Sequence, residues 1–462
     1  MAEQVLLDED TIVAISTPPG RGGIGVVRLS GGLAKGIAEG LVALGRPMGE
    51  KPLTGDSGLV AGRARFGRVL DRATAEVLDE AVVTYFAAPH SYTTEDVVEI
   101  AVHGSPAVLE YLVRACCAGG ARLAGPGEFT QRAFLRGRID LTQAEAVDDL
   151  IQSQTMEQAR VAAQQLGGAL AKVVGPVKER LVGLIAGLEA GIDFAEDDID
   201  VMPAGEILTR VDAVVAPLEE LAKSFGYGRV VREGFSLAIV GRPNAGKSSL
   251  FNRLVERERA IVTATPGTTR DLVTETVSLE GIPVELIDTA GLRASEDEAE
   301  AMGIAKSREA MADADVVLVV VDASAGLGDE ERSLIAGLSG RACVVVWNKS
   351  DLVEDVLVGD GVATSALTGE GVEELRRVVV GLVTGGGASG SQAMITNLRQ
   401  QQAVDGAIAA LVRAKSAVGS GVPHEMVLLD LYEGLQALDS LTGATSSDDI
   451  LHLIFSKFCI GK

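Results

Sequence analysis

The sequence predicts a multidomain α/β protein, in which an α/β domain is inserted into a helical domain and an α+β domain comes first. Strands and helices alternate over residues 234–383, as in a parallel sheet covered by helices on both faces. Helically spaced apolar residues flank that region over 137–233 and 384–462, and short apolar alternations fill residues 1–136. Because the two helical stretches flank the α/β region, the economical interpretation is that they pack together as one domain.

The first segment shows the period-two alternation of β-strands. The stretches TIVAIS, GIGVVRLS, EAVVTYF and DVVEIAVHG alternate apolar and polar residues, and Gly or Pro punctuates the chain between them. A helix is expected over about 105–118. These elements predict an α+β domain over residues 1–136.

The flanking stretches are rich in Ala, Leu, Gln and Glu, which favour helices. Pro176 is expected to break or to start a helix, because proline has no backbone N–H to donate. The acidic run Glu196–Asp200 is expected to be a solvated loop. The segment TGGGASGSQ, residues 384–392, is expected to be a flexible linker.

Composition and charge restrict the class of protein. The chain has 462 residues, enough for several domains of roughly 100–200 residues. Its formal net charge of −24, from 41 basic and 65 acidic residues, argues against broad nonspecific binding of nucleic acid. The four cysteines lack the spacing of a zinc site, and the longest apolar run, Val316–Val321, is far shorter than the ~20 residues of a membrane helix. We therefore expect a cytoplasmic protein without a signal peptide or membrane span.

The sharpest motif is a phosphate-binding loop. Residues Gly241–Ser248 read GRPNAGKS, follow the apolar strand SLAIV and precede the helix SSLFNRLV. Backbone N–H groups of such a loop can surround a diphosphate at a helix N-terminus. Lys247 would reach the outer phosphates, and Ser248 would ligate Mg²⁺. The predicted contacts of this loop with the nucleotide are Asn244, Ala245, Gly246, Lys247, Ser248 and Ser249.

Further motifs follow in the order of a guanine-nucleotide-binding domain. Asp288, after the strand PVELI, can hold Mg²⁺ through a water, and the Gly291 amide can meet the γ-phosphate. Asp351 of NKSD can accept two hydrogen bonds from the N1–H and 2-amino groups of guanine, a pattern that adenine lacks. Thr269 in GTTRD is the predicted switch threonine on Mg²⁺. The predicted nucleotide contacts in these motifs are Thr269, Asp288, Thr289, Ala290, Gly291, Asn348, Lys349, Asp351, Ser365 and Ala366.

These motifs predict a P-loop GTPase (G) domain that hydrolyses GTP with the help of Mg²⁺, but one expected group is missing. Leu292 follows Gly291, where Ras-like GTPases place a glutamine that orients the attacking water. Another group must therefore orient the water, and no arginine is recognisable as a finger that stabilises the transition state. The spacing does not choose among the acids that follow, Glu296, Asp297, Glu298 and Glu300.

The whole chain resembles one family, the tRNA modification GTPase MnmE, also called TrmE, of bacteria and mitochondria. TPPGRGGIGVVRLSG, PHSYTTEDVVEIAVHG and PGEFTQRAFLRGRIDLTQAEAVDDLI resemble its motifs before the G domain. GRPNAGKSSLFN, AIVTATPGTTRD and DTAGLR fit its G-domain block, and the chain ends in the family signature FCIGK. Because these motifs lie in every domain, the resemblance covers nearly the full length.

The resemblance implies a fold and an activity. The family has an N-terminal folate-binding and dimerising domain, a helical domain in two chain segments and an inserted G domain. It acts with a partner flavoprotein, MnmG (GidA), which uses FAD and NADH. Together they add an aminomethyl or carboxymethylaminomethyl group to C5 of the wobble uridine in certain tRNAs. The one-carbon unit comes from a tetrahydrofolate derivative (5-formyl or 5,10-methylene), and K⁺-dependent dimerisation of the G domains of a homodimer drives the conformational cycle.

The resemblance also implies site residues. The family's folate-contacting positions match Arg28, Glu99, Lys462 and Arg138; at the last the family has Lys, and Arg keeps the charge but not the geometry. Its K⁺-binding positions match Asn244, Thr263, Thr265 and Thr268, and K⁺ there would supply the charge that an arginine finger supplies elsewhere.

Thr263 and Thr268 thereby join the predicted GTP contacts. Glu300 matches the glutamate that orients the hydrolytic water, and Lys247 and Glu300 are the predicted catalytic residues. Cys459 matches a cysteine suspected of activating the uridine base.

Several of these residues have an ordinary structural alternative. Arg28 could pair with an acid on the sheet surface, Glu99 could be an exposed strand residue, and Cys459 could be a small buried residue at a helix end. An arginine cluster could contact tRNA phosphates or form surface salt bridges. Its members are Arg114, Arg122, Arg132, Arg136 and Arg138.

Two other functions share part of these features. A ribosome-assembly GTPase that binds rRNA would carry the same G-domain motifs, but the chain has no GXXG loop in a suitable context and is strongly acidic. A folate-binding aminomethyltransferase-like module joined to an unrelated G domain would share the N-terminal half. Deletion of the C-terminal FCIGK would separate these cases, because only the MnmE assignment places Lys462 in the folate site.

Overall fold

The computed structural model of the protein divides into two compact units. Unit 1 comprises Met1–Asp148 and Thr442–Lys462, and unit 2 comprises Asp149–Leu441. The residues that the structure describes are 10–45, 58–193, 202–255, 274–288, 314–353, 361–385, 393–445 and 448–461.

Unit 1 is built on a seven-stranded mixed sheet with the strand order β3-β4-β5-β6-β2-β1-β7. Its pairs are antiparallel except β1 with β7 at one edge. The strands are β1 (Thr11–Ile15), β2 (Gly22–Ser30), β3 (Val42–Leu44), β4 (Ala64–Leu70), β5 (Val77–Phe86), β6 (Val97–Gly104) and β7 (Ala121–Leu123). Strands β1, β2, β5 and β6 cover the four alternating stretches of the sequence to within one residue, which confirms those predictions.

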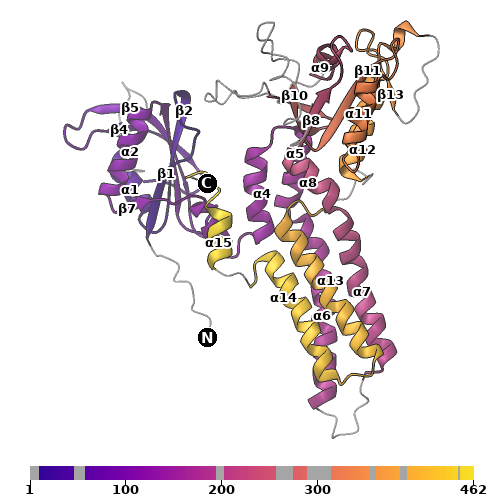
Figure 1. Ribbon diagram of the computed structural model, residues 1–462. Helices are drawn as coiled ribbons and strands as arrows, with labels where there is room; N and C mark the ends of the chain where they lie inside the picture. The colour runs from indigo at the N-terminus through magenta and orange to yellow at the C-terminus, as the bar shows by residue number, and fades with distance from the viewer. Residues whose placement is uncertain are drawn as a thin grey trace. The chain divides into compact units, whose positions relative to one another are not determined.

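Helices α1 (Ala34–Leu41) and α2 (Pro106–Ala118) pack on one face of this sheet (Figure 1). Their buried side chains join those of the strands in one apolar core that includes Val27, Ile100 and Leu112. Pro106 lies at the first turn of α2, where its missing N–H costs no hydrogen bond. The α+β architecture predicted for the N-terminal segment is confirmed.

The end of the chain belongs to unit 1. Helix α15 (Asp448–Phe455) packs against α3 (Glu128–Leu135), and Phe455 and Phe458 share an apolar cluster with Leu141, the first residue of α4 (Leu141–Gln152). The final residues then add a short antiparallel bridge between Ile460 and Pro126. The sequence boundaries at 137 and 384 stay predictions, and the compact units divide the chain at other points.

Four long helices form the helical part of unit 2, namely α6 (Ala169–Asp193), α7 (Ala204–Lys223), α13 (Leu398–Gly419) and α14 (His424–Thr442) (Figure 1). Apolar side chains from all four meet in one core. Two shorter helices, α5 (Met156–Leu166) and α8 (Phe225–Glu233), complete this part.

Two features explain where these helices begin and continue. Thr155 starts α5 with a capping box, in which its side chain accepts from the N–H of Gln158. The expectation that Pro176 would break or start a helix is wrong, because Pro176 lies inside α6. Val174 and Val177 on either side are both buried in the four-helix core, so tertiary packing overrides the lost backbone bond.

The G domain is a six-stranded sheet with the order β13-β12-β11-β8-β10-β9. Its pairs are parallel except for the edge strand β9. Apolar clusters cover both faces of the sheet, which confirms the predicted α/β fold. Its elements are β8 (Phe235–Val240), α9 (Lys247–Val255), β9 (Thr274–Leu279), β10 (Ile282–Asp288), β11 (Val316–Asp322), α11 (Asp329–Gly337), β12 (Cys343–Asn348), η1 (Ser350–Leu352), β13 (Val362–Ala363) and α12 (Val372–Thr384).

The G domain lies between the two helical segments of unit 2 in the chain, as predicted. Within the described part of the chain, no helix is both long and apolar enough to span a membrane.

Candidate functional site

The phosphate-binding loop connects the buried strand β8 to α9 and uses the left-handed backbone region repeatedly. Gly241, Asn244 and Gly246 have φ values of +143°, +64° and +92°. A Cβ atom on Gly246 would lie 2.1 Å from Nδ2 of Asn348, so only glycine fits between the loop and the guanine motif. Ala245 is buried, whereas Ser248 and Ser249 are exposed in the first turn of α9.

Lys247 lies over the loop that precedes it. Its Nζ donates hydrogen bonds of 2.8 Å to the carbonyl oxygens of both Gly241 and Arg242. The N–H of Ala245 also donates to the Arg242 carbonyl, at 3.4 Å. The ammonium group is therefore held within the loop, next to the N-terminus of α9, where a phosphate is favoured.

Asn348 holds the phosphate-binding loop and the guanine motifs together. It is 1% exposed, and its Nδ2 donates to the carbonyl of Ala245 at 2.9 Å. Its Oδ1 accepts from the N–H of Ala366 at 3.0 Å. Asn348 thus binds backbone on both sides, and Asp351 follows it in η1 with an exposed side chain free to face a base.

The predicted contacts Ser365 and Ala366 lie in a loop that is fastened at several points. Ser365 is fully buried, and its Oγ accepts from the N–H of Thr368 at 3.1 Å. Arg253 of α9 donates to the carbonyls of Ala366 and Leu367 at 3.1 and 2.6 Å. The helix that follows the phosphate-binding loop therefore also positions the loop that holds these two predicted nucleotide contacts.

Lys349 adopts a left-handed conformation, with φ of +63°, and its ammonium group pairs with Asp322 at 2.6 Å. Burial raises the pKa of the Asp322 carboxyl, but hydrogen bonds from Lys349 and Ser324 outweigh burial and lower the pKa below its ordinary value. The carboxylate is therefore charged at neutral pH and fixes the lysine beside the end of β11.

A second polar site lies on the sheet of unit 1, where Arg28 of β2 and Glu99 of β6 are cross-strand neighbours. Arg28 donates from Nε and Nη2 to the same Glu99 oxygen, Oε1, at 3.0 and 2.8 Å. Its guanidinium also lies 5.7 Å from the centre of the buried Phe129 ring. The side chains are 23% and 32% exposed, so the pair remains accessible to a ligand.

The end of the chain docks beside this pair. The Gly461 carbonyl accepts from Ser16 Oγ at 3.1 Å and from Arg28 Nη1 at 3.4 Å. A Cβ atom on Gly461 would lie 2.3 Å from the Ile15 carbonyl, so glycine permits this close approach. Cys459 is exposed, and its carbonyl accepts from the N–H of Gly127 at 3.4 Å.

Arg138 contacts Tyr92 and not the Arg28–Glu99 pair. Its Nη1 donates to the Tyr92 carbonyl at 2.7 Å, and its guanidinium lies 5.0 Å from the centre of the Tyr92 ring. The Tyr92 hydroxyl in turn bonds Thr130 of α3 at 3.0 Å. Burial raises the pKa of Tyr92, so this hydroxyl is neutral at physiological pH.

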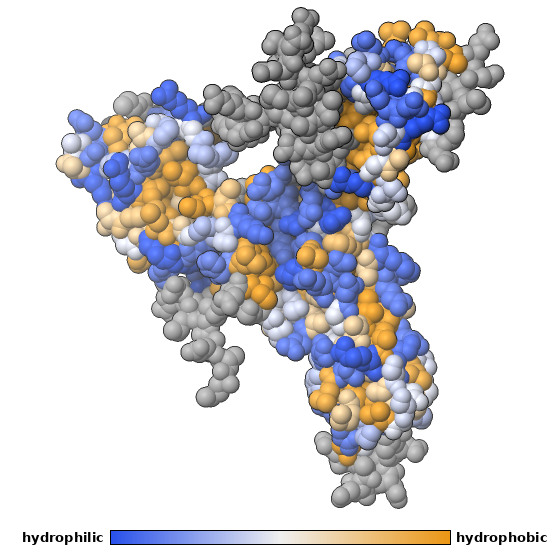
Figure 2. Space-filling view, viewed as in Figure 1, coloured by the Kyte–Doolittle hydropathy of each residue, from blue (hydrophilic) through white to orange (hydrophobic). Residues whose placement is uncertain are grey.

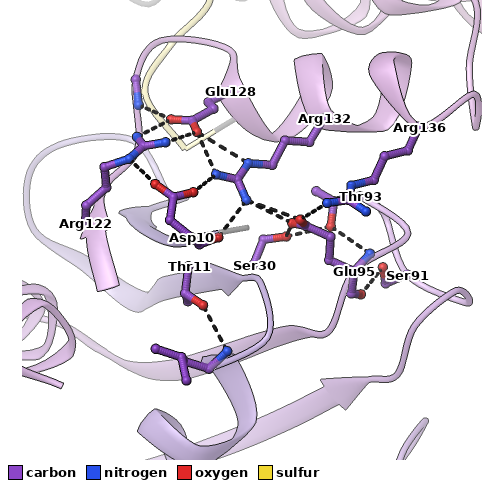
Figure 3. A network of polar contacts seen from close by, with 12 residues as sticks. Asp10, Thr11, Ser30, Ser91, Thr93, Glu95, Arg122, Glu128, Arg132 and Arg136 are labelled. Carbon is purple, nitrogen blue, oxygen red and sulfur yellow. Dashed lines mark hydrogen bonds and ion pairs between the residues drawn. The ribbon is translucent and has the colours of Figure 1, made fainter. Parts of the chain in front are cut away.

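Three arginines of the cluster between 114 and 138 are bound in an internal network (Figure 3). Arg132 is only 6% exposed and contacts Asp10, Glu95 and Glu128. Two further arginines complete the network. Arg122 pairs with Asp10 and Glu128, and Arg136 pairs with Glu95. Of the two alternatives for this cluster, tRNA contact or salt bridges, these three arginines therefore form salt bridges.

The comparisons with known proteins agree along the chain. A model of the MnmE helical domain matches residues 141–459, and a model of the GTP-binding protein TrmE N-terminus matches residues 11–138. The tRNA modification GTPase MnmE of Koribacter versatilis is 58% identical over 459 residues, which cover 98% of this chain and 99% of that protein. The chain belongs to the tRNA modification GTPase MnmE family.

Other relatives carry the same name at lower identity. The MnmE proteins of Moorella thermoacetica and Geotalea uraniireducens are 42% and 40% identical, and each match covers 98% of this chain and 99% or more of the relative. Aquifex aeolicus Era, solved with GDP.AlF4⁻, is 25% identical over 38% of this chain and 66% of its own, with a TM-score of 0.27. Membership of the MnmE family makes this chain a GTP hydrolase of tRNA modification.

Several predicted MnmE-type residues lie outside the described part of the chain. For Asp288 the structure describes the backbone alone, at the end of β10, where it pairs with Ile239. The residues outside are Thr263, Thr265, Thr268, Thr269, Thr289, Ala290, Gly291, Glu300 and Lys462.

Sequence reasoning missed two residues that position the nucleotide motifs. Asp322 ends a run of six buried residues in β11, and a carboxylate at the carboxyl end of a parallel strand was a usable signal. Arg253 had no comparable signal, because its partners Ala366 and Leu367 lie more than 100 positions away.

Proposed function

We propose that the chain couples K⁺-dependent GTP hydrolysis to tRNA modification at C5 of the wobble uridine, giving an aminomethyl or carboxymethylaminomethyl derivative. The partner is a flavoprotein of the MnmG type, and a tetrahydrofolate derivative donates the one-carbon unit. Family membership supports this proposal, and one structural observation carries its folate component: the chain's end docks beside Arg28 and Glu99.

The residues of the G domain suit the ions that the proposal needs. Ser248 offers an exposed hydroxyl in the first turn of α9, and with Thr269 and Asp288 it would provide the oxygen ligands that Mg²⁺ prefers. Asn244 offers an exposed amide oxygen, and with Thr263, Thr265 and Thr268 it would hold K⁺. When bound, the two ions neutralise charge on the transferring phosphoryl group. Glu300 would orient the attacking water, and Lys247 would hold the outer phosphates.

The polar site of unit 1 suits a folate. Both bonds from Arg28 fall on Oε1 of Glu99, so Oε2 can accept from the N–H donors of a pterin ring. Tyr92 contributes partly exposed aromatic surface under Arg138, and the buried Phe129 ring supports Arg28 from below. Lys462 follows the docked Gly461 directly, where its charge would complement a folate carboxylate. The structural alternative also predicts the Arg28–Glu99 pair, but it does not require the docked chain end.

The open face of the unit 1 sheet supports a homodimer. Phe66, Val82, Ala101 and Val26 are successive cross-strand partners on four adjacent strands. Val82 is 45% exposed although it lies in the middle of a strand. Figure 2 shows hydrophobic residues gathered in the middle of this unit between hydrophilic margins. A second copy covering such a face would remove apolar surface from water.

The K⁺ component predicts a salt-specific rate. We expect GTP hydrolysis by the purified chain to be several-fold faster in KCl than in NaCl at equal ionic strength, because K⁺ would supply the positive charge for which the sequence shows no recognisable arginine finger. Steady-state rates in the two salts, together with association measured by light scattering, test this. Equal rates and equal association in both salts would contradict K⁺-dependent dimerisation and leave the GTPase assignment standing.

The folate component predicts that Glu99→Gln weakens binding of 5-formyltetrahydrofolate at least about tenfold, because a neutral amide replaces a charged acceptor. Isothermal titration calorimetry on the full chain measures this affinity. Glu110→Gln, at an exposed position of α2, removes the same charge elsewhere and is the matched control. Removal of residues 459–462 should weaken binding as well, and unchanged affinity after this deletion would show that the chain end is not part of the site.

A further inference from the structure

The second residue of the phosphate-binding loop is tied to a helix that carries none of the nucleotide motifs. Nε of Arg242 lies 3.0 Å from Oε1 of Glu331 in the first turn of α11. Glu331 is 3% exposed, whereas its neighbour Glu330, 3.4 Å from the same nitrogen, has an 81% exposed side chain. The buried carboxylate is therefore the fixed partner of Arg242, and Glu330 is an outer one.

Glu331 is itself held in place from its other oxygen. Oε2 accepts from the N–H of Gly328, the N-cap residue of α11, at 3.0 Å, so the Glu331 side chain satisfies a free N–H at the start of its own helix. One carboxylate thus caps its own helix and receives the arginine of the phosphate-binding loop. Because the Glu331 carboxylate is buried and held by the Gly328 N–H, it defines where the Arg242 guanidinium lies.

Gly328 leaves the space that the guanidinium occupies. A Cβ atom at this position would lie 1.9 Å from Nη2 and 2.4 Å from Cζ of Arg242. The backbone of Gly328 is extended, with φ of −90° and ψ of 178°, which alanine also adopts. The missing side chain is thus needed for the arginine and not for the backbone.

The backbone of Arg242 is part of the loop that receives phosphate. Its carbonyl accepts from Lys247 Nζ at 2.8 Å and from the N–H of Ala245 at 3.4 Å. A displacement of Arg242 therefore changes the support of the lysine that reaches the outer phosphates. This connects the buried carboxylate on α11 to nucleotide affinity in two steps.

We propose that Glu331 is a positioning residue for GTP hydrolysis: through Arg242, seated on Gly328, it holds the phosphate-binding loop in the conformation that binds GTP and GDP. The loop contacts the phosphates of both nucleotides already in the ground state. Loss of the Arg242–Glu331 pair should therefore weaken nucleotide binding more than it slows the chemical step. Helix α11 thereby becomes a place from which nucleotide affinity can be changed without contact with the nucleotide.

Two substitutions displace the arginine by independent routes. Glu331→Gln keeps the shape and an oxygen for the Gly328 N–H but removes the charge that holds Arg242. Gly328→Ala leaves Glu331 unchanged and places a methyl group where the guanidinium lies, and the mobile end of the arginine can move at little cost to folding. Glu330→Gln removes the exposed neighbouring charge and is the matched control.

The full chain and its variants are compared by the kcat and KM of GTP hydrolysis in K⁺ and Mg²⁺ and by the dissociation constant of GDP. We expect Glu331→Gln and Gly328→Ala each to raise KM and the GDP dissociation constant about tenfold, through the loss of one short ion pair to a buried carboxylate, with a much smaller change in kcat. The double variant should bind nucleotide as well as the more affected of the two single variants, because both substitutions act through Arg242. Glu330→Gln should bind like the wild type.

Two results would overturn the proposal. One is unchanged nucleotide affinity in Glu331→Gln and Gly328→Ala, even if their unfolding temperature is lowered. The Arg242–Glu331 pair would then contribute to stability alone and not to nucleotide binding. The other is an additive loss in the double variant, which would show that the carboxylate and the glycine act by separate routes.

Discussion

Replacement of Asp351 by Asn is expected to lower kcat/KM for GTP by about a hundredfold or more and to raise it for xanthosine triphosphate. The aspartate would accept hydrogen bonds from the N1–H and 2-amino groups of guanine. Each hydrogen bond to a charged group contributes about 1.5–3 kcal/mol, and 1.4 kcal/mol is a factor of ten. An asparagine side chain offers an N–H donor, which suits the 2-oxo group of xanthine and leaves the guanine 2-amino group opposed by another donor.

The structure makes Asp351 a suitable position for this test. Its side chain is exposed in η1, whereas the neighbouring Asn348 is buried and bonded to backbone on both sides. Substitution of Asp351 should therefore change base selection without disturbing the loops. Competition kinetics with GTP, ATP and xanthosine triphosphate measure it, with Glu374→Gln on the exposed surface of α12 as the control for charge. If Asp351→Asn loses no preference for GTP, another group recognises the base.

The G-domain fold and most of its candidate site could be predicted from the sequence because they depend on local patterns. Strand β11 is a continuous buried run, and the phosphate-binding loop sits between a strand and a helix, so neighbours along the chain specify both. Asn348 and Asp351 were likewise predicted from one short motif. The partners of these residues were harder to predict, since the Lys349–Asp322 pair joins residues 27 positions apart, at the carboxyl ends of the adjacent strands β12 and β11.

The site of unit 1 could not have been assembled from local patterns alone. The bond between Ser16 and Gly461 joins residues 445 positions apart, and no periodicity in the chain predicts it. Resemblance to the family named Arg28 and Glu99 as members of one site, and the register of β2 with β6 places them side by side. For the arginine cluster, the sequence showed the residues but not their role. Charge counting left two alternatives, and only the burial of Arg132 and Glu95 separates a salt-bridge network from a phosphate-binding surface.

Arg132→Met is therefore expected to destabilise unit 1 by about 3–5 kcal/mol, the usual effect of removing one partner of a buried ion pair. Glu95 is 7% exposed and would keep Arg136 as its one arginine partner, and Asp10 would keep Arg122 but lose Arg132. Hydrogen exchange of unit 1 amides, together with thermal unfolding, measures the loss in a chain of several domains. Arg413→Met is the matched control. Arg413 also contacts two acids, Asp430 and Glu433, but it is 48% exposed, so its loss should change stability little.

The same network predicts how the stability of unit 1 depends on pH. Burial raises the pKa of the Glu128 carboxyl, but hydrogen bonds from Arg122, the Gly125 N–H and Arg132 lower its pKa by more. For Asp10, burial likewise raises the pKa, and Arg132 and Arg122 outweigh it. A carboxyl whose pKa is lower in the folded state stabilises the fold above its unfolded pKa, and that stability is lost as the pH falls through the folded pKa.

Unfolding of the wild type should therefore become easier on acidification, and Arg132→Met should show a shallower acid dependence. An equally steep acid dependence in this variant would show that other carboxyls, and not this network, determine the acid limit of unit 1.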